Sequence, residues 1–310
     1  MPTLQEAFEM FLECQEGVRS PRTIRWYRHY LANLVDFLGE GTEVAAVQLA
    51  DLRRWRTSLV RRATRFEDHP YREAKAGGLS PRTIKGYVQA AKAWFNWLVR
   101  EGVLMESPAA RLEFPLLPTE PPKAISPEDR VRLLAEARAS GPRDYAIVMF
   151  LADTGCRVGG LISLRLEDLV LERGEATVRE KGARARMVYL VEETVRALRV
   201  WLTERPPCHS TQVFIGARGP LKENAINQLL RRLAKRAGVE GRCGPHAFRH
   251  GLAKAMLENG ADLGTVSRIL GHSSIVITDT YYGGWTQAEL KQRHERFSPL
   301  AGYYDEEDGF

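Results

Sequence analysis

Near its C-terminus the chain reads Leu270-Gly271-His272-Ser273-Ser274-Ile275-Val276-Ile277-Thr278-Asp279-Thr280-Tyr281-Tyr282-Gly283-Gly284. This stretch places two tyrosines shortly after a histidine, in a basic protein. A tyrosine hydroxyl is a poor nucleophile while it keeps its proton, because its reference pKa is about 10. Nearby cations and a base that removes the proton would allow it to attack a phosphodiester. The stretch therefore raises a hypothesis of tyrosine chemistry on phosphate, which needs cations elsewhere in the chain.

The overall composition is that of a globular protein. The chain has 310 residues, of which 44% are hydrophobic and 27% are charged, and this length favours two domains over one. No apolar run approaches the roughly eighteen residues of a membrane span, and the N-terminus lacks a signal-peptide pattern. The four cysteines form no CxxC pair, so neither a zinc site nor a disulfide framework is indicated. A reducing cytoplasm is therefore the expected compartment, and no metal or other cofactor is expected.

Positive charge is concentrated in the first third of the chain. Residues 19–100 contain sixteen Lys and Arg against seven Asp and Glu, whereas the net charge of the whole chain is +6. A basic region of this kind favours a polyanionic partner, most often nucleic acid. A solvated basic surface without a partner has the same composition, so charge alone leaves the two alternatives about equal.

A short pattern occurs twice in this basic region. Ser20–Tyr27 and Ser80–Tyr87 both begin Ser-Pro-Arg-Thr-Ile, with an N-cap serine and a proline at the first helical position. Apolar residues then continue at helical spacing in both segments. Because a helix N-terminus with basic side chains suits phosphate, we consider four residues as DNA contacts, with exposed helix charge as the alternative for each: Arg22, Arg25, Arg82 and Lys85.

Prolines divide the chain. Six of the sixteen prolines lie between Pro108 and Pro127, a density that excludes a helix and favours an extended linker. The predicted organisation is therefore an N-terminal helical domain, a proline-rich linker, a second domain and a C-terminal tail, at residues 1–112, 113–126, 127–284 and 285–310.

The second domain is expected to be mainly helical with one small antiparallel sheet. Three short strands are predicted at Leu169–Leu171, Ala176–Val178 and Met187–Leu190, with glycines at the turns between them. The helical pattern breaks at Thr154-Gly155 and resumes at Arg157.

This domain supplies the cations that the tyrosine hypothesis requires. Two arginines can clamp the non-bridging oxygens of a phosphate, a lysine on a turn can protonate a leaving oxygen, and histidines can move the tyrosine proton. Each residue type also has an ordinary role as a surface charge, turn residue, helix cap or packing residue. The candidates are Arg157, Lys181, His246, Arg249 and His272.

In their order and context these residues resemble the motifs of the tyrosine recombinases, the phage-integrase and Xer-type family. Thr154–Leu169 looks like the first arginine box, and Glu180–Arg186 resembles the lysine motif. His246–His250 resembles the His-x-x-Arg box, and Leu270–Tyr281 is similar to the segment with the third histidine and the nucleophile. The first domain is similar to the family's core-binding helical domain, including its Ser-Pro helix starts.

The resemblance implies a mainly α fold with two domains. These are an N-terminal helical core-binding bundle of the SAM-like type and a mixed α/β catalytic domain. It also implies a site-specific recombinase that cuts and rejoins DNA through a 3′-phosphotyrosyl intermediate without metal or ATP. The implied catalytic set is Arg157 and Arg249 as phosphate clamp, Lys181 as general acid, His246 and His272 as assisting groups, and Tyr281 as nucleophile. Tyr282 is a second candidate nucleophile that fits the spacing from the histidine less well.

The implied partners are double-stranded DNA with inverted-repeat core sites and further copies of the chain, as a tetramer in the synaptic complex. No membrane partner is implied, and the implied location is the cytoplasm, in association with the nucleoid. The tail 285–310 is expected to dock on a neighbouring subunit, with Gly283-Gly284 as its hinge.

One departure from the family pattern keeps other functions open. The family usually has an acidic residue three positions after the first arginine, whereas this chain has Gly160 there. Glu167 or Asp168 are the candidate substitutes. If no acid substitutes, the chain would be a DNA-binding protein with impaired catalysis. A type IB topoisomerase is a separate alternative, because that class shares the active-site logic but relaxes DNA as a monomer.

Overall fold

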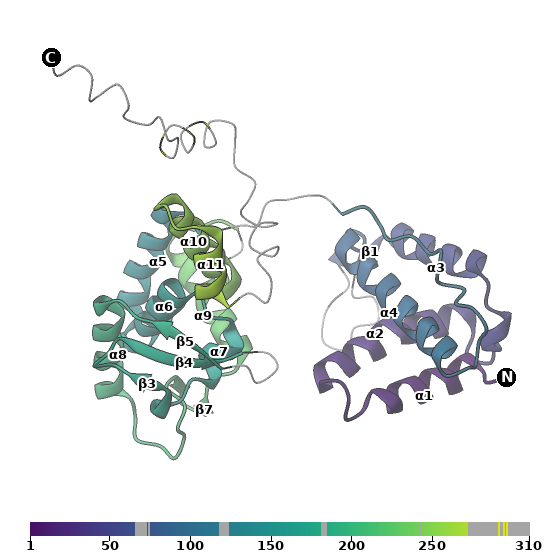
Figure 1. Ribbon diagram of the computed structural model, residues 1–310, viewed down its shortest axis with the longest axis horizontal. Helices are drawn as coiled ribbons and strands as arrows, with labels where there is room; N and C mark the ends of the chain where they lie inside the picture. The colour runs from purple at the N-terminus through teal and green to yellow at the C-terminus, as the bar shows by residue number, and fades with distance from the viewer. Residues whose placement is uncertain are drawn as a thin grey trace. The chain divides into compact units, whose positions relative to one another are not determined.

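The computed structural model describes residues 1–65, 73, 75–117, 124–180, 185–241, 243–271, 291, 294 and 296. The chain divides into two compact units, Met1–Thr119 and Glu120–Phe310 (Figure 1).

The first unit is a helical bundle around a largely buried helix. Its elements are α1 (Leu4–Gln15), α2 (Pro21–Leu38), η1 (Val44–Ala46), α3 (Leu49–Arg61), β1 (Thr64–Arg65), β2 (Lys75–Ala76) and α4 (Pro81–Arg100). In α4, Trp94 and Phe95 are fully buried, and the indole Nε1 of Trp94 donates to the carbonyl of Ala7 at 3.3 Å. The short antiparallel β1–β2 pair was not predicted from the sequence.

The two Ser-Pro segments begin α2 and α4, as predicted. In each helix the N-cap serine, Ser20 or Ser80, accepts a hydrogen bond from the backbone N–H of a threonine three residues later at 3.2 Å. The two helices are in contact through Tyr30 and Tyr87, whose ring centroids are 4.5 Å apart. A Cβ at Gly86 would approach the Tyr30 ring to 3.0 Å, so glycine permits this close approach.

The second unit consists of helices around one three-stranded antiparallel sheet, in the order β3-β4-β5. Its elements are α5 (Pro127–Ser140), α6 (Pro142–Thr154), α7 (Val158–Ser163), η2 (Leu166–Asp168), β3 (Leu169–Val170), β4 (Glu175–Arg179), β5 (Ala185–Tyr189), α8 (Glu192–Glu204), β6 (Ile215–Gly216), β7 (Gly219–Pro220), α9 (Glu223–Arg236), α10 (Pro245–Glu258) and α11 (Leu263–Leu270). The three predicted strands are present. The β6–β7 hairpin was not predicted, because strands of two residues leave no periodic pattern.

Helix α6 lies at the centre of this unit. It packs against α5, α8 and α10, which explains why apolar residues occur on all its sides: Ile147, Val148, Phe150 and Leu151 are all fully buried. Figure 1 shows α10 and α11 beside it. In the sheet, Ala176 and Val178 of β4 face the core, and Thr177 between them is only partly buried.

The fold is therefore mainly α with two domains and a small sheet in the second, as predicted.

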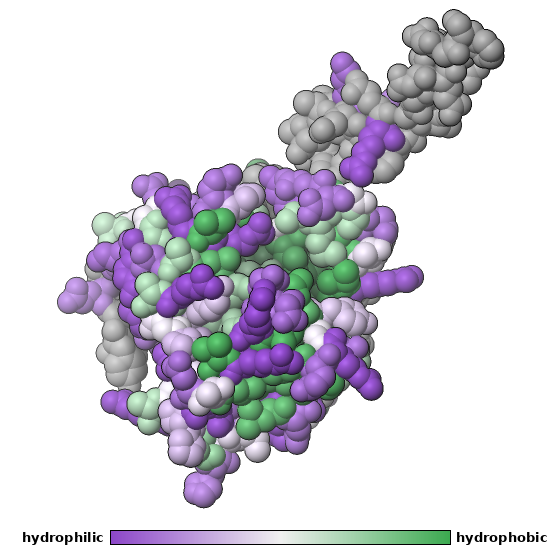
Figure 2. Space-filling model, turned by 90° about the vertical axis from the view of Figure 1, so that its left-hand side faces the viewer, coloured by the Kyte–Doolittle hydropathy of each residue, from purple (hydrophilic) through white to green (hydrophobic). Residues whose placement is uncertain are grey.

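Both described ends of the predicted linker, 113–126, contact the unit that they adjoin. At the first end, Lys85 and Lys92 lie 5.6 Å from the ring centroid of Phe114. At the second end, the N–H of Ile125 donates to the carbonyl of Ala247 at 3.3 Å. Within the described part of the chain, no helix combines the length and apolarity needed to cross a bilayer. Figure 2 shows one face on which apolar patches lie between charged side chains.

Candidate phosphate-binding site of the second unit

Arg157 lies at a sharp break between two helices. Helix α6 ends at Gly155 in the left-handed conformation, with φ 55°, and Arg157 is the N-cap residue of α7. Thr154 fixes the break, because its hydroxyl donates to the carbonyl of Phe150 at 2.6 Å and accepts from the N–H of Cys156 at 3.2 Å. The predicted interruption at Thr154-Gly155 is confirmed, and it directs Arg157 away from the axis of α6.

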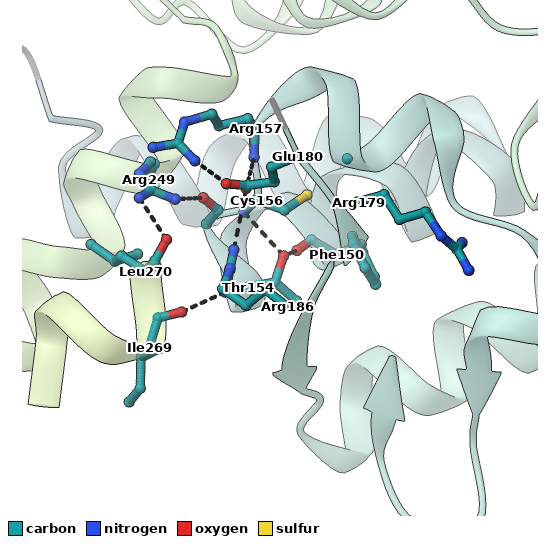
Figure 3. Close-up of polar contacts among 12 residues, drawn as sticks. Phe150, Thr154, Cys156, Arg157, Arg179, Glu180, Arg186, Arg249, Ile269 and Leu270 are labelled. Carbon is teal, nitrogen blue, oxygen red and sulfur yellow. Dashed lines mark hydrogen bonds and ion pairs between the residues drawn. The ribbon is translucent and has the colours of Figure 1, made fainter. Parts of the chain in front are cut away.

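Arg249 connects this break to α10 and α11. Its Nη1 donates to the carbonyl of Gly155 at 3.0 Å, and its Nη2 donates to the carbonyl of Leu270 at 2.6 Å (Figure 3). The side chain is only 3% exposed. A Cβ on Gly155 would lie 3.0 Å from Leu270 and 3.4 Å from the Cα of Arg249, so glycine lets the three helices meet closely.

The carboxylate that faces Arg157 belongs to Glu180, directly after β4. Its Oε1 accepts from the backbone N–H of Arg157 at 3.1 Å, and its Oε2 accepts from the Arg157 guanidinium. Oε1 also lies 3.4 Å from Nη2 of Arg186, on β5. Arg186 in turn donates from Nη1 to the carbonyl of Ile269 at the end of α11. Glu180 thus links two arginines, and Figure 3 shows this cluster beside the end of α11.

Positive charge is crowded at this place. Burial lowers the pKa of Arg157, and the charge of Arg186 lowers it further, although a guanidinium remains protonated at neutral pH. Burial also lowers the pKa of His246, with further contributions from Arg249 and Arg157 and a smaller opposing one from Glu223. His246 still reaches the surface. An anion bound here would relieve the repulsion among these groups, which makes the cluster suitable for a phosphate.

The thiol of Cys156, next to Arg157 in the chain, is not a candidate nucleophile. Cys156 is fully buried, and its burial raises the pKa of the thiol to about 11, so it stays protonated at neutral pH. Among the residues that the structure describes, no group of three or more His, Cys, Asp or Glu is placed to bind a metal ion.

The structure brings three of the predicted catalytic residues together: Arg157 and Arg249 lie close to each other in Figure 3, and both act on the pKa of His246. Lys181, His272 and Tyr281 lie outside the described residues, as do Tyr282, Gly283-Gly284 and most of the tail 285–310. In the first unit, Arg22, Arg25 and Arg82 are exposed and Lys85 is half-buried, all within the first two turns of α2 or α4.

The expected substitutes for an acid at Gly160 were wrong. Glu167 pairs with Arg165, and Asp168 contacts Arg179 at 2.5 Å; Figure 3 shows Arg179 pointing away from Arg157. The two functional candidates missed from the sequence are Glu180 and Arg186. Both belong to the segment that resembles the lysine motif, but no charge partner was assigned to either.

Comparison with known proteins identifies the family. Residues 123–286 match the phage integrase family, which is more than half of the chain. The chain is 32% identical over 306 residues to the tyrosine recombinase XerC of Xanthomonas campestris pv. campestris, covering 97% of this chain and 86% of the relative. The chain belongs to the phage integrase family. It is a tyrosine recombinase, an enzyme that transfers DNA strands.

Other family members agree with this assignment. The tyrosine recombinase XerD of Listeria monocytogenes serovar 1/2a is 30% identical over 314 residues, and the match covers 97% of this chain and 100% of the relative. The crystal structure of XerA recombinase is 27% identical, covers 95% of this chain and 99% of its own, and superimposes with a TM-score of 0.53. The integrase of transposon Tn1549, solved in complex with a circular intermediate DNA, shares the fold with a TM-score of 0.75 at 18% identity, covering 96% of this chain and 100% of that chain.

Proposed function

We propose that this tyrosine recombinase is a site-specific recombinase of double-stranded DNA and that Tyr281 is its nucleophile. The observation that carries the proposal is the partly desolvated, positively charged cluster in which Arg157 and Arg249 lie close together (Figure 3) and both lower the pKa of His246. The Leu270 carbonyl, bound by Arg249, lies two residues before His272 in sequence, so the cluster adjoins the start of the segment that contains the proposed nucleophile.

The proposed reaction exchanges one phosphoester for another. The Tyr281 oxygen attacks phosphorus and forms the 3′-phosphotyrosyl bond, the bond from phosphorus to the 5′ oxygen breaks, and the 5′ oxygen receives a proton from Lys181. The tyrosine proton passes to His246 or His272. A 5′ hydroxyl from the partner DNA then attacks the phosphotyrosine, which restores a phosphodiester and frees the tyrosine. Bond energy is conserved, so the exchange needs no ATP.

Arg157 and Arg249 would supply the electrostatic part of catalysis. Charge on the non-bridging oxygens increases as phosphorus becomes pentavalent, and fixed guanidinium groups stabilise that charge without reorganising at the moment of reaction. The buried bonds of Arg249 to two backbone carbonyls and the contact of Arg157 with Glu180 provide such fixed positions. No metal is required for a site in which arginines perform this role.

Several parts of this proposal concern assembly. We propose that the protein binds inverted-repeat core sites, forms a tetramer in the synaptic complex, and docks its tail 285–310 on a neighbouring subunit. The proposed parts of the chain are a core-binding domain at 1–112, a linker at 113–126 and a catalytic domain at 127–284. The four basic residues at the starts of α2 and α4 are proposed as DNA-backbone contacts.

The test begins with the DNA that the purified full-length protein selects from a random-sequence duplex library. Nicked duplexes that carry the selected sequence trap a covalent intermediate, because the short fragment that bears the freed 5′ hydroxyl diffuses away after cleavage. We expect a protein–DNA adduct on a denaturing gel, with and without EDTA, that is lost in Tyr281→Phe and kept in the matched variant Tyr282→Phe.

Three outcomes would contradict the proposal. Selected duplexes that bind tightly and never form an adduct would indicate a DNA-binding protein with impaired catalysis. An adduct that persists in Tyr281→Phe would exclude Tyr281 as the nucleophile. Relaxation of a supercoiled plasmid that lacks the selected sequence would favour the topoisomerase alternative.

A further inference from the structure

We infer that Glu180 is the positioning residue for Arg157 and that it replaces an acidic side chain at position 160. The inference rests on the proposed function, because it explains how Arg157 is held for a phosphate. Glu180 itself would touch no DNA; it would act through the guanidinium.

The contact between the two residues defines the direction of the arginine. One carboxylate oxygen of Glu180 accepts from the backbone N–H of Arg157, and the other accepts from its guanidinium. A single carboxylate therefore fixes both the start of α7 and the end of the side chain. Glu180 is 7% exposed, whereas the Arg157 side chain is 36% exposed, so the acid is buried behind an arginine that still reaches solvent. This is the arrangement needed to present a cation to a ligand.

Gly160 leaves the space that this arrangement requires. Arg157 is the N-cap residue of α7 and Gly160 is the third helical residue, N3, the position from which an acidic side chain can reach back to the N-cap backbone N–H. A Cβ added at Gly160 would lie 3.4 Å from the Cβ of Val178 and 3.6 Å from the Cγ of Glu180, which are ordinary van der Waals distances. The space beyond such a Cβ is occupied by the Glu180 side chain itself. The space between β4 and α7 holds one carboxylate, which can come from position 160 or from position 180.

The second partner of Glu180 extends the effect to α11. Arg186 contacts Glu180 and also donates to the carbonyl of Ile269, and its side chain is 14% exposed. Without Glu180, Arg157 and Arg186 would face each other as like charges, since the charge of Arg186 already lowers the pKa of Arg157. The carboxylate therefore keeps the two cations in place on opposite sides of one acid.

The first experiment measures cleavage of the nicked duplex at saturating DNA by Glu180→Gln. We expect the cleavage rate to fall by about 10- to 100-fold, the effect of a misplaced reactive group, while the Kd for the duplex changes little. The matched control is Asp168→Asn, which removes a carboxylate of similar burial, 4% exposed, from the Arg179 pair near the same sheet. Asp168→Asn should lower the melting temperature at least as much as Glu180→Gln does. Its cleavage rate should stay within a few-fold of the rate of the unmodified protein.

A neutral substrate separates positioning from a general structural effect. If the scissile phosphate is replaced by a methylphosphonate, one negative oxygen that Arg157 would bind is absent. The ratio of the unmodified enzyme's rate to the Glu180→Gln rate should then decrease by about tenfold. An unchanged ratio would show that Glu180 does not act through the charge of Arg157.

Moving the acid gives the most specific test. Glu180→Ala should cleave slowly, and Gly160→Glu alone should also cleave slowly, because two carboxylates would be forced into one space. The double variant has one carboxylate again, so we expect it to cleave faster than either single variant. A double variant that is as slow as the product of the two single effects would refute the exchange of positions.

Failure of this inference is distinguishable from failure of the proposed function. If the unmodified protein forms no adduct with any selected duplex, the proposed function is wrong. If it forms the adduct and Glu180→Gln does so at the same rate, only the role of Glu180 is wrong.

Discussion

Gly271 offers a quantitative test of how Arg186 is held. It follows α11 with φ 67°, in the left-handed region, and a Cβ there would lie 2.5 Å from Cδ and 2.9 Å from Nε of Arg186. Arg186 has little freedom to withdraw, because its terminal nitrogens donate to Ile269 and to Glu180. We therefore predict that Gly271→Ala both strains the backbone and displaces Arg186.

The expected loss of stability has two parts. A left-handed conformation costs an ordinary L-residue about 1–2 kcal/mol. Displacing Arg186 weakens at least one hydrogen bond of a charged and largely buried group, which is worth about 1.5–3 kcal/mol. The free energy of unfolding of the second unit should therefore decrease by about 2.5–5 kcal/mol in Gly271→Ala.

Gly238 provides the matched control. Its φ is 62°, close to that of Gly271, and the nearest atom to an added Cβ is a terminal nitrogen of Arg132 at 4.0 Å. Gly238→Ala should therefore carry only the backbone part, about 1–2 kcal/mol. Urea denaturation can be followed by alkylation of Cys156 and Cys243, which are buried in the second unit and become reactive when it unfolds.

Equal destabilisation by the two alanine substitutions would refute this reasoning. That result would mean that Arg186 moves aside without loss, so its interactions with Ile269 and Glu180 contribute nothing measurable. A larger loss in Gly271→Ala that disappears when Arg186 is also replaced by alanine would confirm that the collision with Arg186 is its source.

Three further predictions follow from burial and charge. Burial, with Arg249 and Arg157, holds the pKa of His246 below its usual 6.5, so the stability that the neutral imidazole contributes is complete above that pH and decreases as pH falls through 6.5 towards the folded value. The melting temperature should therefore fall less between about pH 7 and 5 in His246→Gln than in the original protein, and an equal fall in both proteins would contradict this. Native protein treated with iodoacetamide at neutral pH should be alkylated at exposed Cys14 and Cys208 and not at Cys156 or Cys243, where burial raises the thiol pKa to about 11; mass spectrometry of native Cys156 modification would contradict this. Replacing Arg22, Arg25, Arg82 and Lys85 with alanine should reduce the slope of log affinity against log salt by about 0.9 for each phosphate that the variant no longer neutralises, and an unchanged slope would show that these residues do not bind the DNA backbone.

Local signals explain which elements were predictable. The starts of α2 and α4 follow from Ser-Pro caps, and the break before Arg157 follows from Thr154-Gly155, because these features act on their immediate neighbours. The three-stranded sheet followed from short β-rich segments with glycines between them. The β6–β7 hairpin depends on backbone pairing of Ile215 and Gly216 with residues of low strand propensity, so its sequence carries no such signal.

The acid beside Arg157 shows where reasoning from sequence neighbours fails. Glu167 and Asp168 were considered because they are close to Arg157 along the chain, yet the contact is made by Glu180, twenty-three residues away. It depends on the end of β4 lying against the start of α7, which is a tertiary contact. No motif for the first arginine contains that information.

The strand period nevertheless contained a usable signal. Side chains alternate between the two faces of a strand, and Ala176 and Val178 are the buried residues of β4. Glu180 continues the same parity, so extending the strand by one residue places a carboxylate on the core side. A buried carboxylate requires a cationic partner. In the same region the sequence offers Arg157 at a helix start and Gly160, which lacks a side chain of its own. Glu180 is thus an acid on the buried side of a strand, and Gly160 is a glycine where an acid is expected. Together they predict, from the sequence alone, that the acid has moved from position 160 to position 180.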